Sequence, residues 1–274
     1  MTYKYSFIGV GNMARALISA ITSLEGKLRC EPSDVFLYDK NESQTAEFNG
    51  LGYNIARTID EAVENANFIF LCVKPQNYRE VLEYIKESGI SLEHKTLVSV
   101  AAGISTSQIC DCLGLECAVI RTMPNTPMTI GLGVCAVCRN EKVETKDFER
   151  ICRILSSKAE LLMLDESQMN NIIGITSSSP AYVYKFIDSL LSAAKAQGLD
   201  SPKMLEIICK VMIGSAQMVL NSDKSVKDLI SAVRSPNGTT ERALAVFDAN
   251  GFEETVLDAV DACNRRADTL GEEM

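Results

Sequence analysis

The hydrophobic pattern of the chain changes its period at about residue 165. Before that point, short apolar runs of strand length alternate with stretches whose apolar residues recur at helical spacing. This βαβ repetition predicts an α/β fold with a parallel, doubly wound sheet and helices on both of its faces. The predicted strands cover residues 4–10, 35–39, 68–73, 97–101, 119–121, 133–138 and 161–164, and the predicted helices begin at Asn12 and cover 43–49, 59–66, 78–87 and 146–157.

After residue 165 the apolar positions follow only the helical period. The predicted helices cover 180–197, 202–220, 239–250 and 252–270, several with Pro in the first turn or Gly just after the end. We therefore expect two domains, an α/β domain over residues 1–165 and an all-helical domain over residues 166–274.

The composition restricts the classes of protein to which this chain can belong. Hydrophobic residues make up 46% of the 274 residues and charged residues 23%, as in a globular protein. The net charge is −9, and no basic cluster would follow a nucleic-acid backbone or an anionic membrane. No apolar run approaches the length of a bilayer span, and the first residues lack a signal-peptide pattern. We therefore expect a cytoplasmic protein with no nucleic-acid or membrane partner.

The cysteines and the single histidine argue against a metal site, a redox site and histidine-based catalysis. The ten cysteines are scattered through apolar segments and are expected to be reduced, buried thiols. Cys135 and Cys138 form a Cys-x-x-Cys inside a predicted buried strand, so we interpret them as packing residues and expect no metal site. His94 is the single histidine and lies in a polar turn expected to be exposed. Histidine-based catalysis therefore has no basis, and a cofactor must bring the chemistry.

A glycine motif lies between the first predicted strand and helix. In Gly9-x-Gly11-x-x-Ala14, Gly9 permits a tight turn, Gly11 allows the backbone to approach a pyrophosphate, and Ala14 permits close packing of helix and strand. The helix start at Asn12 and Met13 supplies unpaired N–H groups. An ordinary strand-to-helix turn would show the same glycines, but in this context we favour a dinucleotide site.

The end of the second strand bears on which dinucleotide binds. Asp39 would accept hydrogen bonds from the adenosine ribose and repel a 2′-phosphate, whereas Lys40 could pair with that phosphate. A solvated charge pair in a turn fits equally well. NADPH and NADH both stay open at this point.

Three further strand ends should lie at the same edge of the sheet, where open α/β folds bind ligands. Small residues after one of these strands would leave room for a flat ring, and two prolines stiffen the loop after another. Strand termination alone would also explain the Pro and Gly residues. The residues at these ends are Val73, Lys74 and Pro75, then Ala101, Ala102 and Gly103, and finally Met123, Pro124 and Asn125.

A polar turn precedes one of the late helices. The segment 235–240, Ser-Pro-Asn-Gly-Thr-Thr, combines two hydroxyls with a helix start near Glu241, so its N–H groups could bind a carboxylate. An ordinary N-cap would explain this segment by itself better than a ligand site does.

Taken together, these segments resemble the pyrroline-5-carboxylate reductase family, in order and along essentially the whole chain. The Met-Pro-Asn-Thr-Pro and Ser-Pro-x-Gly-Thr-Thr segments are far more specific than the glycine motif. The matching segments are 9–14, 73–76, 101–104, 119–127, 179–182 and 235–240.

The resemblance implies an N-terminal Rossmann domain that binds NADPH or NADH, with NADPH slightly favoured, and a helical dimerisation domain whose dimers can assemble into a decamer. It implies that the loop 235–240 comes from the partner subunit and faces the nicotinamide. Thr240 would bond the imine nitrogen of the substrate. The backbone of Asn237, Gly238 and Thr239 would hold the substrate carboxylate, and the remaining implied substrate residues are Ser178 and Ser235.

Three departures from the family pattern bear on catalytic efficiency and substrate range. Ser177 and Ser179 stand where the family usually has Gly, Asn237 replaces the first Gly of Pro-Gly-Gly, and Arg234 stands where a small polar residue is common. Asn is the residue that best tolerates a left-handed backbone after Gly.

Two alternatives to a pyrroline-5-carboxylate reductase stay open. The first is a related imine or β-hydroxyacid reductase. The latter places a catalytic Lys four residues after the last Gly of its helix start, whereas Lys185 follows Ser179 by six residues. The second is a catalytically silent, nucleotide-binding paralogue, which the serines near Ser178 favour and the intact Thr240 disfavours.

Overall fold

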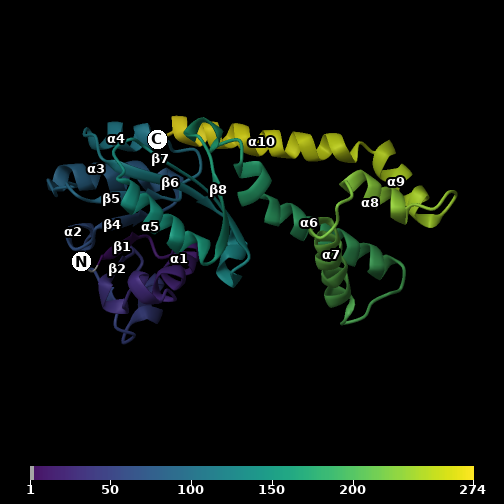
Figure 1. Ribbon diagram of the computed structural model, residues 1–274, viewed down its shortest axis with the longest axis horizontal. Coiled ribbons are helices and arrows are strands. Elements are labelled where there is room, and N and C mark those ends of the chain that lie inside the picture. Colours follow the sequence, from purple (N-terminus) through teal and green to yellow (C-terminus); the bar gives the residue numbers. More distant parts are fainter. Residues whose placement is uncertain (1–2) are drawn as a thin grey trace. The chain divides into compact units, whose positions relative to one another are not determined.

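The computed structural model describes residues 3–274 and contains two compact units (Figure 1). One unit takes the chain up to Ser178 together with Ala262–Met274, and the other is Ser179–Asp261. The first unit is thus completed by the C-terminal residues, which the predicted division at residue 165 had placed entirely in the second domain.

The first unit is built on one eight-stranded sheet with the strand order β3-β2-β1-β4-β5-β6-β7-β8. All neighbouring strands are parallel except β6 and β7, which are antiparallel. The eight-residue connection between these two strands carries one proline, Pro127, and only a short 3-10 turn, so it is too short for a crossover and reverses the chain. The strands are β1 Tyr5–Ile8, β2 Val35–Tyr38, β3 Asn54–Ile55, β4 Phe68–Leu71, β5 Thr96–Ser99, β6 Ala118–Pro124, β7 Gly133–Arg139 and β8 Ala159–Met163.

Helices cover both faces of this sheet, as the sequence predicts. Alternate strand residues point to opposite faces, so Phe7 and Phe70 belong to one apolar core while Ile8 and Leu71 belong to another. The first core includes residues of α1 and α5, and the second includes residues of α2, α3 and α4. The helices of this unit are α1 Asn12–Thr22, α2 Ile59–Glu64, α3 Tyr78–Ser88, α4 Thr106–Leu113 and α5 Thr145–Ser156, followed by a π turn at Ile173–Ser177.

Several local predictions were wrong or incomplete. The helix expected over 43–49 is two short 3-10 turns, Glu42–Gln44 and Ala46–Phe48, because the bonds here run between residues three apart and Gly50 with φ 77° ends the segment. The two-residue strand β3 and the helix α4 were not predicted. Cys135 and Cys138 do lie buried in β7, where burial raises the pKa of each thiol to about 12.

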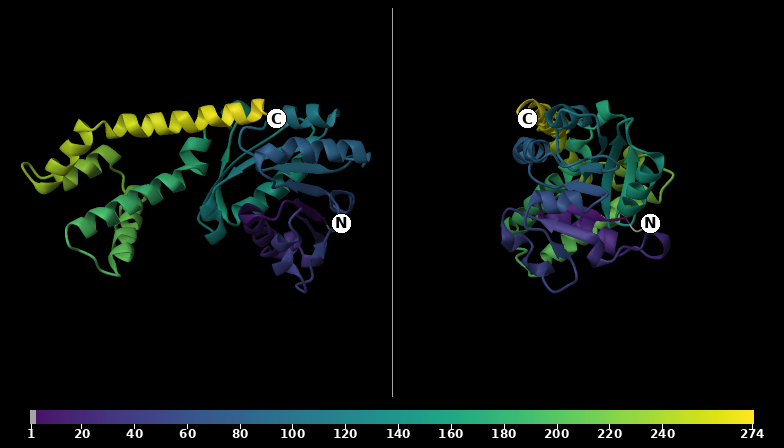
Figure 2. Two further views of the ribbon diagram at one scale, coloured as in Figure 1. Left: turned by 180° about the vertical axis from the view of Figure 1, so that it is seen from behind. Right: turned by 90° about the vertical axis from the view of Figure 1, so that its left-hand side faces the viewer.

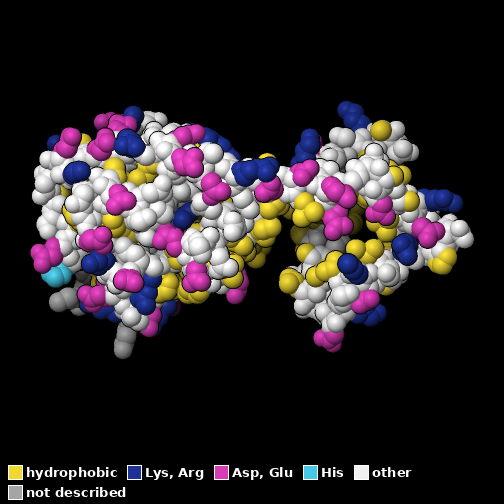
Figure 3. Space-filling model, turned by 90° about the horizontal axis from the view of Figure 1, so that it is seen from above, with side chains coloured by type: hydrophobic (Ala, Val, Ile, Leu, Met, Phe, Trp, Pro, Cys, Tyr) yellow, Lys and Arg dark blue, Asp and Glu magenta, His cyan; other side chains and the backbone are white. Residues whose placement is uncertain are grey.

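The second unit is all helix, which confirms the predicted fold class. It contains α6 Ser179–Ala196, α7 Met204–Leu220, α8 Val226–Val233, α9 Thr239–Ala249 and the first part of α10 Phe252–Glu272. Many of its large apolar side chains are exposed, for example Leu220 at 77% and Ile213 at 63%, and hydrophobic atoms are visible on its surface in Figure 3. Exposed apolar area of this extent is typical of a surface that binds another chain.

No helix within residues 3–274 combines the length and the apolar character that a bilayer span requires.

Candidate active site

Gly9 joins three strand ends at the start of the candidate site. Its backbone has φ +92°, and a Cβ atom built here would lie 2.9 Å from the backbone of Cys72 and Val73. Its N–H donates to the carbonyl of Tyr38 at 2.8 Å. Only glycine accepts both this conformation and this approach, so the turn after β1 is held against the ends of β2 and β4.

The N-terminus of α1 is open toward solvent. Gly11 is its N-cap residue, no side chain bonds to the first turn, and that turn contains no acidic residue. A Cβ atom at Gly11 would meet nothing within 4 Å, whereas Ala14 is fully buried against the sheet. The free N–H groups and the positive end of the helix dipole fit a pyrophosphate, because no side chain of the described residues caps this helix.

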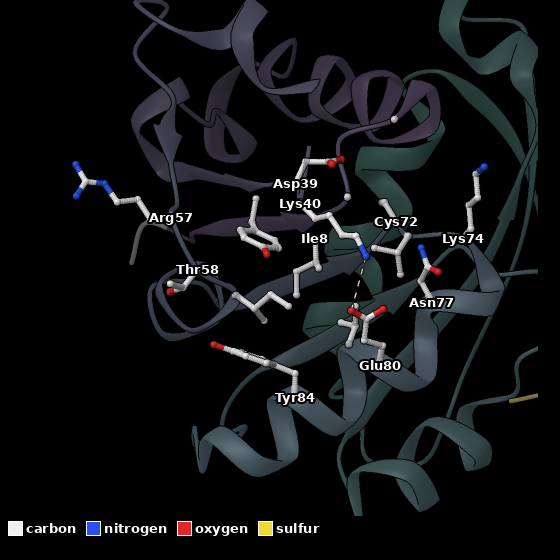
Figure 4. A pocket seen from close by; sticks show the side chains of 16 residues that line it. Ile8, Asp39, Lys40, Arg57, Thr58, Cys72, Lys74, Asn77, Glu80 and Tyr84 are labelled. Carbon is white, nitrogen blue, oxygen red and sulfur yellow. Dashed lines mark ion pairs between the residues drawn. The ribbon is translucent and has the colours of Figure 1, made fainter. Parts of the chain in front are cut away.

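A cavity of about 620 Å³ lies beside this turn (Figure 4). It brings together predicted cofactor residues from three separate segments, at the carboxyl edge of β1, β2 and β4. These residues are Gly9, Gly11, Asp39, Lys40, Val73 and Lys74.

Asp39 organises the turn as well as facing the cavity. Its Oδ2 accepts from the N–H of Val10 at 2.7 Å, and its Oδ1 accepts from the N–H of Asn41 at 2.9 Å. Lys40 Nζ lies 3.8 Å from Glu80 Oε1, and since both side chains are mostly exposed this pair contributes little. Both Asp39 oxygens therefore already have a backbone donor.

Several residues of the same cavity were missed by sequence reasoning, and three of them are polar or aromatic residues from segments that had no predicted site. Arg57 and Thr58 follow β3, and Tyr84 comes from α3 (Figure 4). β3 is too short to show an apolar period, so nothing in the pattern located the chain here. The available signal was Thr58 itself, whose hydroxyl accepts from the N–H of Glu61 and caps α2.

The predicted residues after β5 and β6 lie outside this cavity. Ala101 is buried, and Gly103 has φ +81° and lines a second cavity of about 340 Å³. Tyr78 ties the ends of β4 and β5 together, because its hydroxyl donates to the carbonyl of Leu71 at 2.6 Å and lies 3.0 Å from Ser99 Oγ. Burial raises the pKa of Tyr78, so its hydroxyl stays protonated.

Asn125 has both ends of its amide engaged by the protein. Its Oδ1 accepts from the N–H of Val134 at 2.9 Å, and its Nδ2 donates to the carbonyl of Thr176 at 3.1 Å. The neighbouring Met123 is 4% exposed. The structure thus gives Asn125 a bracing role between β7 and the π turn.

Ser177, which departs from the family pattern, and Ser178, which follows it, lie at the end of this turn. The Oγ of Ser178 accepts from Cys263 Sγ at 3.2 Å. The Oγ of Ser177 is buried and has no hydrogen-bond partner among the described residues.

The loop 235–240 leads into α9 of the helical unit. This helix begins at Thr239, as the predicted range 239–250 gives it and two residues before the start placed near Glu241. Asn237 has φ 58°, so the predicted left-handed tolerance is used here. Its N–H donates to Glu241 Oε2 at 2.7 Å, and the N–H of Gly238 donates to the carbonyl of Ser235 at 2.9 Å. Two of the three backbone groups expected to hold a carboxylate therefore have an acceptor within the protein.

The glycine turn, the open helix end and the cavity at the carboxyl edge of a doubly wound sheet define a dinucleotide-dependent oxidoreductase with an added helical unit. Comparisons with known proteins give the family. Residues 166–270 match the family described as pyrroline-5-carboxylate reductase dimerisation, and residues 4–103 match NADP oxidoreductase, coenzyme F420-dependent.

Individual relatives match this chain along its full length. The pyrroline-5-carboxylate reductase of Escherichia coli is 31% identical, with 98% of this chain and 99% of that chain covered. The enzyme of Pseudomonas aeruginosa is 32% identical, with 100% of this chain and 98% of that chain covered. A crystal structure of Plasmodium falciparum pyrroline carboxylate reductase with NADP bound has a TM-score of 0.87 at 28% identity and covers 98% of both chains. The chain belongs to the pyrroline-5-carboxylate reductase family, which confirms the resemblance seen in the sequence.

Proposed function

We propose that this protein reduces the C=N bond of 1-pyrroline-5-carboxylate to give L-proline, the last step of proline biosynthesis. The observation that carries the proposal is the end-to-end match to relatives of that name, in a chain that keeps the open helix end after its glycine turn. NADPH or NADH supplies the hydride when bound.

The residues of the first unit divide the cofactor between them. Gly9 and Gly11 leave space for the pyrophosphate at the N-terminus of α1, and the ends of β2 and β3 face the adenosine side. Ala101–Gly103 would hold the nicotinamide side, as would Pro75 and the segment 123–125, at the carboxyl ends of neighbouring strands. This division assigns cofactor binding to residues 1–165 and substrate binding with dimer formation to residues 166–274.

On the substrate side, the loop 235–240 comes from the partner subunit. The Thr240 hydroxyl hydrogen-bonds to the imine nitrogen and orients the ring, donating to the neutral imine and accepting from the protonated one. A hydroxyl is too weak an acid to be the proton source, so the proton comes with the protonated imine or from water. The N–H group of Thr239, at the start of α9, binds the substrate carboxylate, and that of Asn237 joins it when the substrate displaces Glu241.

The proposal includes self-association through the helical unit. Residues 166–270 match a dimerisation family, and the exposed apolar side chains of this unit fit such an interface. We extend this to a decamer built from five dimers. We also propose a cytoplasmic location, which is supported by the ten free thiols of the described chain, because such cysteine usage is typical of a reducing compartment.

The test follows NADPH and NADH absorbance with pyrroline-5-carboxylate, for the wild type and for Thr240→Ala. Turnover should fall on the order of a hundredfold in the variant, since a donor aimed at the reacting group is lost. Thr255→Ala, in α10 of the same unit, is the matched control and should keep its activity, because its hydroxyl bonds only to the carbonyl of Gly251. If both cofactors bind and neither is oxidised, the protein binds nucleotides without reducing this substrate. The serines at 177–179 would then be the first positions to test as the cause of the lost activity.

A further inference from the structure

The last turns of α10 pack backbone to backbone on the segment that follows β5. A Cβ atom at Gly271 would lie 2.3 Å from the carbonyl oxygen of Gly103, and one at Gly103 would lie 2.1 Å from the carbonyl oxygen of Ala267. Both glycines and Ala267 are buried. Figure 2 shows this end of α10, next to the C-terminus, beside the first unit's helices. The two segments cannot approach each other any further. A side chain at Gly103 or at Gly271 would push the two segments apart.

Gln108 locks the same contact through both ends of its amide. Its Oε1 accepts from the N–H of Ser105, as part of the capping box of α4, and its Nε2 donates to the carbonyl of Gly271 at 2.7 Å. The carbonyl of Gly271 is in the last turn of α10, where carbonyls lack helical partners. One side chain thus fixes the start of α4 to the end of α10.

A polar cluster anchors this contact to the sheet. Arg121 on β6 donates through Nη2 to Asn170 Oδ1 at 2.5 Å, and Asn170 Nδ2 donates to Asp268 Oδ1 of α10 at 2.7 Å. Glu166 accepts from the N–H of Thr106 at 2.6 Å. The segment between β5 and α4 and the end of α10 are therefore held to one another and to the same strand.

We infer that the C-terminal end of α10 positions Ala101–Gly103, with Gly103, Gln108 and Gly271 as positioning residues for the nicotinamide side of the cofactor. The inference rests on the proposed function, which places the nicotinamide against Ala101–Gly103. The adenosine side binds in the separate cavity beside Gly9, so a shift of this segment acts on one half of the cofactor.

Two variants test the inference. In Gly271→Ala the new Cβ must move from Gly103 by about 1 Å before van der Waals contact is restored, and misplacement of that size at a reacting centre can cost about a hundredfold in rate. Gln108→Glu keeps the shape and the acceptor for Ser105 but loses the donor to Gly271. Asp111→Asn, exposed on the same helix as Gln108, is the control.

Calorimetric titration compares the whole cofactor with its adenosine-side fragment, 2′,5′-ADP or 5′-AMP to match the preferred cofactor. We expect fragment binding within about twofold of wild type, with whole-cofactor binding and turnover per folded protein reduced about tenfold or more in both variants. Equal weakening of fragment and cofactor, or a lower melting temperature with unchanged binding and turnover, would show that the contact only stabilises the fold. If Gly271→Ala does not fold, the result for Gln108→Glu decides. If the wild type binds cofactor without reducing pyrroline-5-carboxylate, the proposed function fails, while the binding comparison still tests the positioning role.

Discussion

Replacing Glu166 by glutamine removes one charge from a buried cluster and changes its shape little. Arg121 is 2% exposed on β6, and its Nη1 lies 3.7 Å from Glu166 Oε1. Burial lowers the pKa of Arg121, and the nearby Glu166 carboxylate opposes that shift. In the variant the guanidinium stays buried and charged while the carboxylate that pairs with it is gone.

The expected cost follows from this burial. Removing one partner of a buried ion pair destabilises a protein by about 3–5 kcal/mol. Because the Glu166 side chain is 32% exposed, water screens part of the change. We therefore expect about 3 kcal/mol, at the low end of that range. In a protein of this size that corresponds to a fall in melting temperature of roughly 6–12 °C.

Urea and thermal unfolding at one fixed subunit concentration would measure this loss, since self-association makes stability concentration-dependent. Ser167→Ala, at the exposed neighbouring position, is the control and should stay near wild type. The double variant Arg121→Met with Glu166→Gln should recover part of the loss, because it no longer buries an unpaired charge. A loss below about 1 kcal/mol in Glu166→Gln would refute the reasoning, since the guanidinium would then be balanced by other groups.

Three further outcomes are expected. Gly9→Ala should destabilise the turn by about 1–3 kcal/mol and weaken cofactor binding, measured by NADPH titration, because the new Cβ meets Cys72 backbone at positive φ. Glu241→Ala should lower the KM for substrate about two- to fivefold by removing a carboxylate that occupies the Asn237 N–H; a higher KM would mean that its support of the turn matters more. Burial raises the pKa of Asp147, so its charged form costs stability above that pKa, and Asp147→Asn should stabilise by up to about 0.5 kcal/mol at pH 7. This gain should shrink in urea unfolding as the pH falls through the raised pKa, where the folded wild type takes up the proton.

The elements that the sequence predicts correctly are those whose geometry a few adjacent residues determine. The turn after β1 needs Gly9 for its positive φ and Ala14 for close packing, and both requirements are readable in six residues. The helices α4 and α8 were not predicted, because the apolar period needs a longer segment to show. α4 and α8 each span eight residues and show barely two turns of apolar period. Their recoverable signals were capping boxes, Ser105 with Gln108 and Ser225 with Asp228.

Contacts between distant residues could not be predicted in this way. Arg121 and Glu166 are 45 positions apart, and each is an ordinary charged residue in its own segment. In the sequence Gly271 looks like an ordinary terminating glycine just after the predicted helix 252–270, until its contact with Gly103 is seen. Its presence in the last turn of α10 is explained only by the segment it packs against.

The loop at Asn237 combines a correct backbone prediction with a side-chain partner that the sequence did not reveal. The preference of Asn for a left-handed backbone is intrinsic, so the value of φ 58° could be anticipated. The bond from its N–H to Glu241 depends on the direction of one rotatable side chain four residues later. Replacement of the family's Gly by Asn237 therefore leaves the turn intact. What decides carboxylate binding at this N–H is whether the substrate can displace Glu241.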